Sequence, residues 1–129
     1  MSQRHALIID DNPTNGSVLA NMLADENVDN TRLTNPKQLD ATLKNLSSID
    51  VVFLDLEMPG LNGYEVLERL KSDVHFQTVP IVAYTVHISE INTAHQVGFD
   101  SFLGKPLNPD KFPEQLARIL RGERVWEVT

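Results

Sequence analysis

The amino-acid sequence predicts an α/β fold, in which a parallel sheet is covered by helices on both faces. Short apolar runs alternate with helical patterns five times along the 129 residues, and such alternation is typical of a parallel sheet with crossover helices. Three of the runs, Ala6–Ile9, Val51–Leu54 and Ile81–Tyr84, are almost entirely apolar, as strands covered on both faces must be. The length suits one domain, and no internal repeat or linker interrupts the pattern.

The predicted strands are short and mostly rich in β-branched or aromatic residues. In chain order they are His5–Asp10, Asp29–Thr34, Asp50–Asp55, Val79–Thr85 and Asp100–Gly104. The second strand is more polar than the others, so we expect it near an edge of the sheet.

The predicted helices carry apolar residues at helical spacing. In chain order they are Pro13–Glu26, Pro36–Leu46, Gly63–Ser72, Ser89–Val97 and Pro109–Arg121. Asn12, Asn35 and Asn108 each precede a proline, and an amide N-cap followed by proline at the first helical position is typical of a helix start. Asn62 is a candidate cap for the third helix, and Gly98 ends the fourth.

Composition excludes several classes of protein. The chain has no cysteine, so neither disulfides nor thiolate metal sites stabilise it. Its 18 acidic and 11 basic residues give a net charge of −7, and the basic residues are mostly scattered, which disfavours direct nucleic-acid binding. No run approaches the roughly 20 apolar residues of a membrane helix, and the first apolar run is too short for a signal peptide. We therefore expect a soluble, cytoplasmic protein without a membrane partner.

The end of the chain is treated separately from the repeated pattern. We predict one domain over residues 1–121 and a C-terminal tail over residues 122–129. The tail holds the only tryptophan, Trp126. Three alternatives stay open: the tail docks on the domain, contacts a partner, or begins a linker to a longer protein.

Charged and hydroxyl side chains follow four of the predicted strands. They are Asp10 and Asp11 after the first, Asp55 at the end of the third, Thr85 at the end of the fourth, and Lys105 after the fifth. In an open α/β sheet, ligands bind outside the carboxyl ends of the strands. Two carboxylates about 4 Å apart repel by roughly 4 kcal/mol at a surface-like effective dielectric, so this cluster needs counter-charge. A hard cation such as Mg²⁺ meets that need, and Lys105 adds a further positive charge.

Four motifs at these strand ends resemble one family. They are Asp10-Asp11, the FLDLEMPGLNGYE stretch around Asp55, PIVAYT ending at Thr85, and VGFDSFLGKP, which contains Phe102, Lys105 and Pro106. From end to end, the chain resembles the receiver domain of two-component response regulators. The resemblance implies a flavodoxin-like (βα)5 doubly wound sandwich, with a five-stranded parallel sheet in the order 2-1-3-4-5.

The resemblance also implies a phosphoacceptor and a metal site. In that family the residue matching Asp55 accepts a phosphoryl group from a phosphohistidine and becomes an aspartyl phosphate. The residues matching Asp11 and Asp55, together with the backbone carbonyl of Glu57, ligate Mg²⁺. Asp10 supports the metal through water. A carboxylate is a known covalent nucleophile, and phosphoryl transfer depends mainly on positioning and charge neutralisation.

A conformational switch is implied in the same way. Lys105 pairs with one phosphoryl oxygen, and Thr85 donates its hydroxyl to another. Two charge-assisted hydrogen bonds supply about 3–6 kcal/mol, and about 5.5 kcal/mol moves a two-state equilibrium from 1:99 to 99:1. Thr85 moves toward the phosphoryl group, and Phe102 fills the space that it leaves; the alternative is that Phe102 is only a core ring. The peptide bond before Pro106 is expected to be cis.

Three residues near the acceptor bear on the lifetime of the phosphoryl group. Val86 stands where the family usually has a small residue, so we expect it to narrow access to Asp55. Glu57 and His87 each lie two residues past a site residue, and we predict that both flank the attacking water. The alternative for His87 is a solvated loop residue.

The function implied is a signalling switch, which catalyses only its own phosphorylation and dephosphorylation. Its expected partners are a sensor histidine kinase or a histidine phosphotransfer protein, a downstream protein that the sequence does not name, and a second copy of the chain on phosphorylation. The output is expected through the fourth helix, fifth strand and fifth helix. One alternative is a receiver-like interaction module that acts without phosphorylation. Another is a haloacid-dehalogenase-like phosphatase, whose motif needs aspartate at the position of Glu57.

Overall fold

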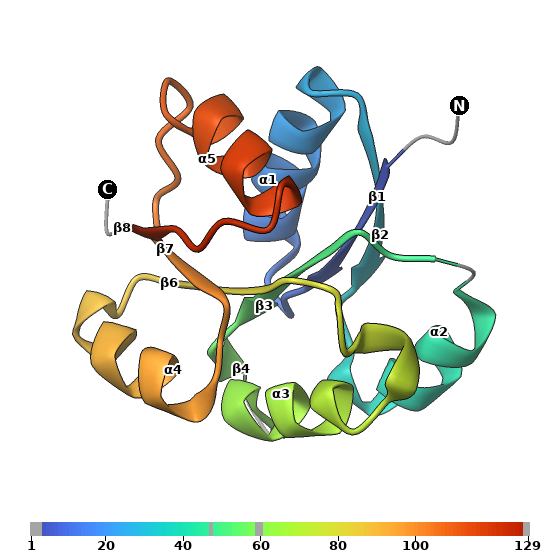
Figure 1. Ribbon diagram of the computed structural model, residues 1–129. Helices are drawn as coiled ribbons and strands as arrows, with labels where there is room; N and C mark the ends of the chain where they lie inside the picture. Colours follow the sequence, from blue (N-terminus) through green and yellow to red (C-terminus); the bar gives the residue numbers. More distant parts are fainter. Residues whose placement is uncertain (1–3, 47, 59–60, 128–129) are drawn as a thin grey trace.

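Helices cover both faces of a central sheet in the computed structural model, which describes residues 4–46, 48–58 and 61–127 (Figure 1). The helices α1 (Pro13–Asp25) and α5 (Phe112–Leu120) lie on one face, and α2 (Leu39–Asn45), α3 (Gly63–Lys71) and α4 (Ile91–Val97) lie on the other. The ends of the predicted domain and tail, residues 1–3 and 128–129, lie outside the described residues, as do residues 59–60 of the motif after Asp55.

The sheet is parallel throughout its described part. Its strands are β1 (Arg4–Ile9), β2 (Val28–Leu33), β3 (Val51–Asp55), β6 (Ile81–Thr85), β7 (Ser101–Gly104) and β8 (Trp126–Glu127). The order is β2-β1-β3-β6-β7-β8, so the first five strands confirm the predicted order. The sixth strand, β8, was not predicted.

Shorter elements connect the strands and helices. The strands β4 (Glu57–Met58) and β5 (Leu61–Asn62) form a small antiparallel pair after β3. Three 3₁₀ turns, η1 (Pro36–Gln38), η2 (Val74–Phe76) and η3 (Ile88–Glu90), precede α2, β6 and α4.

The helix starts show where local signals decide the structure. Asn12 caps α1 by accepting hydrogen bonds from the N–H groups of Thr14 and Asn15 at 2.9 and 3.1 Å. Asn62 caps α3 by accepting from the Tyr64 N–H at 2.7 Å. Gly98 follows α4 with a φ of 107°, a left-handed conformation that favours glycine. These three predictions are confirmed.

Two predicted starts were too early. The α-helical part of the second helix begins at Leu39, after the 3₁₀ turn that follows Asn35. Asn108 accepts a hydrogen bond from the Asp110 N–H at 2.9 Å, yet α5 begins only at Phe112. An asparagine that bonds the backbone two residues ahead forms a turn of its own. A second proline, Pro113, then occupies the first turn of the helix.

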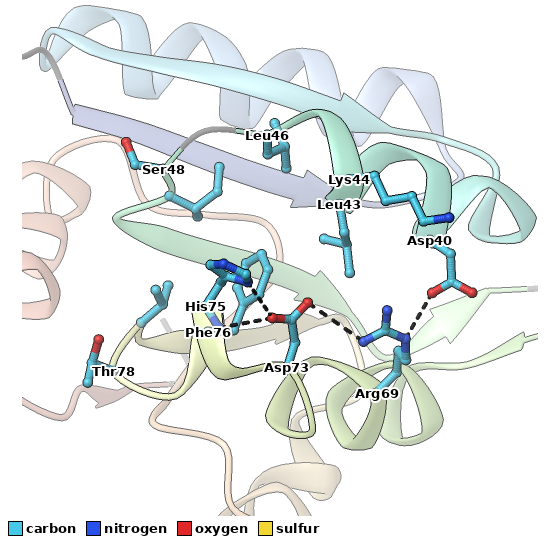
Figure 2. Close-up of a pocket in the computed structure, with 12 residues that line it drawn as sticks. Asp40, Leu43, Lys44, Leu46, Ser48, Arg69, Asp73, His75, Phe76 and Thr78 are labelled. Atoms are coloured by element: carbon cyan, nitrogen blue, oxygen red, sulfur yellow. Dashed lines mark hydrogen bonds and ion pairs between the residues drawn. The ribbon is translucent and has the colours of Figure 1, made fainter.

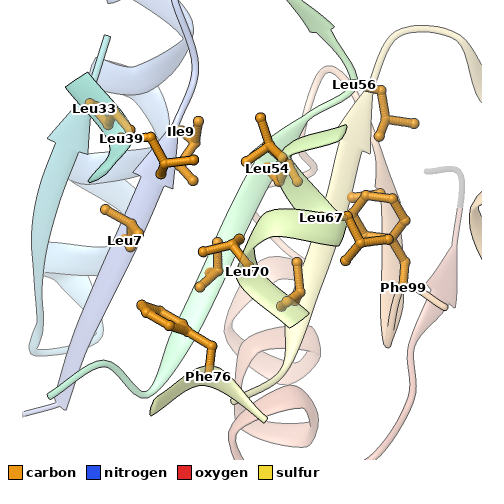
Figure 3. Close-up of a cluster of buried hydrophobic side chains, with 14 of the residues drawn as sticks. Leu7, Ile9, Leu33, Leu39, Leu54, Leu56, Leu67, Leu70, Phe76 and Phe99 are labelled. Atoms are coloured by element: carbon orange, nitrogen blue, oxygen red, sulfur yellow. The ribbon is translucent and has the colours of Figure 1, made fainter. Parts of the chain in front are cut away.

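Two apolar clusters form the core, one on each face of the sheet. The first packs strand residues such as Leu7, Ile9 and Leu54 against Leu67 and Leu70 of α3 (Figure 3). The second lies toward α1 and α5, and its strand residues include Ala6, Ile8, Val51, Phe53 and Tyr84.

The alternation of side chains along the strands positions the polar residues that follow. Successive side chains of a strand point to opposite faces. Asp10 lies two residues after Ile8, and Asp55 lies two residues after Phe53. Both aspartates therefore continue the spacing of the second cluster, which is the cluster that contains Tyr84.

The tail folds back onto the domain at Val125 and β8. Val125 is buried, its N–H donates to Ser101 Oγ at 2.9 Å, and its carbonyl accepts from the Phe102 N–H at 2.8 Å. The Trp126 ring lies 4.8 Å from the His95 ring of α4. Of the three alternatives for the tail, docking on the domain is the one observed for residues 125–127. No helix in the described ranges is long and apolar enough to cross a membrane.

Candidate functional site

Three carboxylates converge at the carboxyl ends of β1 and β3. The register pairs Ile9 with Leu54, so Asp10 and Asp55 emerge from neighbouring strands. One oxygen from each of Asp10, Asp11 and Asp55 lies within 4.8 Å of the others. Asp10 and Asp55 are buried, and Asp11 is half-buried. The structure therefore brings together the three acids that were predicted from their positions at the strand ends.

Lys105 lies between two of these carboxylates. Its Nζ is 3.2 Å from Asp10 Oδ2 and 3.5 Å from Asp55 Oδ2. Its backbone N–H donates to the Thr85 carbonyl at 2.9 Å, which ties the loop after β7 to the end of β6. The Lys105–Pro106 peptide bond is cis, as the resemblance implied.

Thr85 and Phe102, the expected switch residues, are both buried. The Thr85 Oγ1 accepts a hydrogen bond from the His87 N–H at 3.1 Å. A hydroxyl that accepts still carries its own proton to donate. Phe102 belongs to the first apolar cluster and pairs with Ala83 across the sheet, so it is a core ring in this structure. Its movement stays a prediction.

A cleft of about 190 Å³ opens over the acids. It is lined by Asp11, Asn12, Asn15, Asp55, Thr85, Val86 and Lys105. Val86 is 60% exposed and lines this cleft beside Asp55. His87 is exposed and is not among the described lining residues. The Glu57 side chain lies outside what the structure describes, so the roles of Glu57, Val86 and His87 in lifetime stay predictions.

Tyr84 is a site residue that the sequence argument missed. Its hydroxyl donates to Asp10 Oδ2 at 2.6 Å, and the Lys105 Nζ lies 4.2 Å from the centre of its ring. Burial, followed by the hydrogen bond to Asp10, raises the pKa of Tyr84 far above its ordinary value, so the hydroxyl stays protonated. Tyr84 lies two residues after Val82 of the second cluster, and the register pairs it with Asp55, so the sheet places its side chain on the face of Asp10 and Asp55.

The donor set suits a hard divalent cation. Three carboxylates face one ammonium, which leaves an excess of negative charge. All the side-chain donors are oxygen atoms, and carboxylate oxygens are the ligands that Mg²⁺ prefers in proteins. The described residues therefore fit Mg²⁺.

A larger cavity, of about 460 Å³, lies apart from the cleft over the acids and shares no lining residue with it. It is bordered by α2 and by the segment that joins α3 to β6 (Figure 2). Asp73 accepts hydrogen bonds from the backbone N–H and the ring of His75, both at 2.9 Å, and these bonds hold the pKa of Asp73 below its usual value. Arg69 Nε donates to Asp40 at 2.8 Å. None of the predicted site residues lines this cavity.

The family comparison agrees with this geometry. A family model described as the response regulator receiver domain matches residues 6–117. The chain therefore belongs to the response regulator receiver domain family, which confirms the resemblance seen in the sequence.

Curated relatives are similar over different shares of their own length. Protein RcaC of Microchaete diplosiphon is 33% identical over 98 residues, which are 74% of this chain and 15% of RcaC. The two-component response regulator ORR5 of Oryza sativa is 25% identical over 91% of this chain and 89% of its own. The DNA-binding response regulator MtrA of Mycolicibacterium smegmatis is 31% identical over 95% of this chain and 53% of its own. The absence of nucleic-acid binding stays a prediction.

Solved structures share the fold. A response regulator receiver protein from Burkholderia phymatum has a TM-score of 0.79 and 26% identity, covering 92% of this chain and 96% of that one. The receiver domain of a sensor histidine kinase from Pseudomonas aeruginosa has a TM-score of 0.81 and 23% identity, covering 93% of this chain and 99% of that one. The latter holds a magnesium ion in its active-site cleft.

Proposed function

We propose that the chain is the phosphoacceptor switch of a two-component phosphorelay, with Asp55 as the acceptor and a phosphohistidine as the donor. The observation that carries this proposal is that Asp55, Thr85 and Lys105 line one cleft, in which Lys105 Nζ is 3.5 Å from the Asp55 carboxylate. A sensor histidine kinase or a histidine phosphotransfer protein supplies the donor. The chain acts in its own phosphorylation and dephosphorylation and turns over no separate substrate.

The transfer requires a nucleophile and neutralising charge. An Asp55 carboxylate oxygen attacks the phosphorus, and the new P–O bond forms as the P–N bond of the donor breaks. The imidazole of the donor leaves with the electron pair of that bond. Lys105 supplies its ammonium to the phosphoryl oxygens. Asp11, Asp55 and the Glu57 carbonyl would hold Mg²⁺, with Asp10 supporting it through water, and the bound ion would neutralise further charge.

The response begins at Thr85. Its hydroxyl proton is available to donate to a phosphoryl oxygen, because the oxygen acts as acceptor for the His87 N–H. Phe102 then takes the space that Thr85 leaves. The output passes by protein–protein contact to a downstream target, and phosphorylation promotes pairing of two copies of the chain.

The test is the intact mass of the full chain incubated with acetyl phosphate and Mg²⁺. Wild type is expected to gain one phosphoryl group, and Asp55→Asn to gain none. Asp29→Asn, which changes an exposed aspartate of β2, is the matched control and is expected to behave as wild type. If wild type gains no mass with acetyl phosphate or with phosphoramidate, the proposal fails and the interaction-module alternative takes its place.

A further inference from the structure

We propose that Tyr84 is a positioning residue for Mg²⁺ binding, because its hydroxyl holds the Asp10 carboxylate in the orientation that the metal site needs. This inference rests on the proposed function, since it takes the Mg²⁺ site as given. It adds a buried core side chain, from the second-last residue of β6, to the residues that line the cleft.

The Asp10 carboxylate has a defined set of hydrogen-bond donors. Its Oδ1 accepts from the Asn12 N–H at 2.9 Å. Its Oδ2 accepts from the Tyr84 hydroxyl at 2.6 Å and from Lys105 Nζ at 3.2 Å. The Asn12 donor is backbone and Tyr84 is a packed ring, whereas Lys105 is at the end of a flexible chain. Tyr84 is therefore the rigid donor to Oδ2, and together with Asn12 it sets the plane of the carboxylate.

The ring of Tyr84 has little freedom to move. It is 1% exposed and meets the Phe53 ring edge-on, with centroids 6.3 Å apart and an interplanar angle of 86°. A buried tyrosine hydroxyl needs a polar partner, and here that partner is Asp10. The position of the hydroxyl is thus determined by the core of the protein.

A neutral donor has an electrostatic advantage at this point. The Tyr84 hydroxyl satisfies an anionic oxygen without adding the positive charge that would repel a divalent cation. Lys105 satisfies the same oxygen but opposes the metal. Without the hydroxyl, Lys105 is the one donor left to Oδ2 among the described residues, and we expect the ammonium to move closer to Asp10. Removing an outer-shell group of a metal site typically lowers metal affinity by about 10–100-fold. Tyr84 acts through Asp10, which supports the metal through water, so we expect the lower end of that range.

The experiment compares wild type with Tyr84→Phe and with Tyr64→Phe in the full chain. The chain has two tyrosines, and the Tyr64 hydroxyl also donates to a carboxylate, Glu90 Oε2 at 2.8 Å, but does not line the cleft. Titration calorimetry with Mg²⁺ is expected to show a dissociation constant raised about tenfold for Tyr84→Phe. Tyr64→Phe is expected to stay within about twofold of wild type. Circular dichroism checks that both variants are folded.

Kinetics with acetyl phosphate provide a second readout that a general structural defect would not reproduce. In Tyr84→Phe the half-saturating Mg²⁺ concentration should rise with the dissociation constant. The rate at saturating Mg²⁺ should stay within about threefold of wild type, because phenylalanine keeps the ring face against Lys105.

Each outcome separates the two claims. If wild type binds Mg²⁺ and Tyr84→Phe binds it equally well, the Tyr84 inference fails and the proposed function stands. If wild type binds no Mg²⁺, both fail. A loss of affinity as large in Tyr64→Phe, or a fall of about tenfold or more in the saturated rate of Tyr84→Phe, overturns the positioning role.

Discussion

Lys105 carries two opposing effects within one cleft. Its ammonium lies 3.2 Å from Asp10 and 3.5 Å from Asp55, and it is 10% exposed at its side chain. The positive charge relieves the repulsion among the acids, and it also raises the energy of a divalent cation placed beside them. Once Asp55 is phosphorylated, the same charge faces phosphoryl oxygens. Metal binding and phosphoryl transfer should therefore respond in opposite directions to its removal.

Replacing Lys105 by methionine tests this opposition. Lys105→Met should bind Mg²⁺ at least about threefold more tightly, because the competing charge is gone. Its phosphorylation rate with acetyl phosphate should fall by about 100-fold, the usual cost of removing one group that stabilises developing charge. Calorimetry and the rate of mass gain measure the two effects, with Lys37→Met as an exposed control. A variant in which affinity and rate fall together would contradict the account of Lys105.

Residue types and strand order go far toward predicting this site. Asp10, Asp55 and Thr85 could be grouped from the sequence because the carboxyl ends of parallel strands share one edge of the sheet. Tyr84 could not be separated from the apolar run around it, since its hydroxyl acquires a role only when β6 lies two strands from β1. The contact of Lys105 with Asp10 depends on side-chain rotamers, which residue order does not determine.

At the scale of elements, Gly63, the first residue of α3, lies directly against the end of β3. A Cβ at this position would lie 2.7 Å from the Asp55 carbonyl oxygen and 2.7 Å from the Leu56 Cα. Both are backbone atoms, so the start of α3 can approach β3 this closely only with glycine. The helix and its Asn62 cap thereby support the backbone that follows Asp55.

The added methyl group of Gly63→Ala should displace the backbone of Asp55 and Leu56. We expect a loss of about 1–3 kcal/mol in the free energy of unfolding, measured by urea denaturation, together with slower phosphorylation. The matched control is Gly16→Ala in α1, where the added Cβ would meet only the flexible Arg32 side chain, at 3.0 Å. A Gly63→Ala protein as stable as the control would show that the close approach matters little.

The strand β8 has only two residues, and its position depends on contacts with β7 and α5. It pairs with β7 through Phe102 and Leu103, and its Glu127 accepts from Gln115 Nε2 at 2.7 Å and from Arg118 Nη1 at 3.2 Å. The hydrogen bond from Gln115, and then the contact with Arg118, hold the pKa of Glu127 below its ordinary value of 4.5. The ionised form of Glu127 is therefore the form that favours docking.

A lowered pKa predicts loss of docking in acid. The contribution of Glu127 is complete above the ordinary glutamate pKa of 4.5 and is lost as pH falls through the lower value of the folded protein. Trp126 fluorescence should change below that pH in wild type before circular dichroism does, and Glu127→Gln should lack this early step. His95 contacts the Trp126 ring in both proteins, so the comparison isolates the contribution of Glu127. Identical titrations in the two proteins would contradict a role for Glu127.

At the scale of the whole molecule, three neighbouring strands lead from the cleft to the tail. Thr85 lies on β6, Phe102 on β7 and Trp126 on β8, and the register pairs Ala83 with Phe102 and Phe102 with Trp126. Phe102 and Trp126 both pack in the first apolar cluster. Thr85 itself pairs with Gly104, two residues after Phe102 on β7, so the end of β6 lies one strand away from β7, on which β8 docks.

The layers could be predicted because each apolar strand requires cover on both faces, and the order of the first five strands followed from the resemblance. The start of α5 could not, because Asn108 and Pro109 carry the stronger local signal, yet Asn108 forms a turn with Asp110 and the helix begins at Phe112. The sixth strand, β8, could not be predicted either, since two residues show no periodicity. Its pairing depends on the hydrogen bond between Val125 and Ser101.

The most direct test of the phosphoacceptor assignment is to locate the modified residue. The full chain is phosphorylated with acetyl phosphate and Mg²⁺, reduced with borohydride, which converts an acyl phosphate of aspartate to homoserine, and mapped by peptide mass spectrometry. We predict homoserine at Asp55 alone, and none when Mg²⁺ is omitted. Homoserine at Asp10 or Asp11 with Asp55 intact would contradict the assignment, as would phosphorylation that leaves all three unchanged.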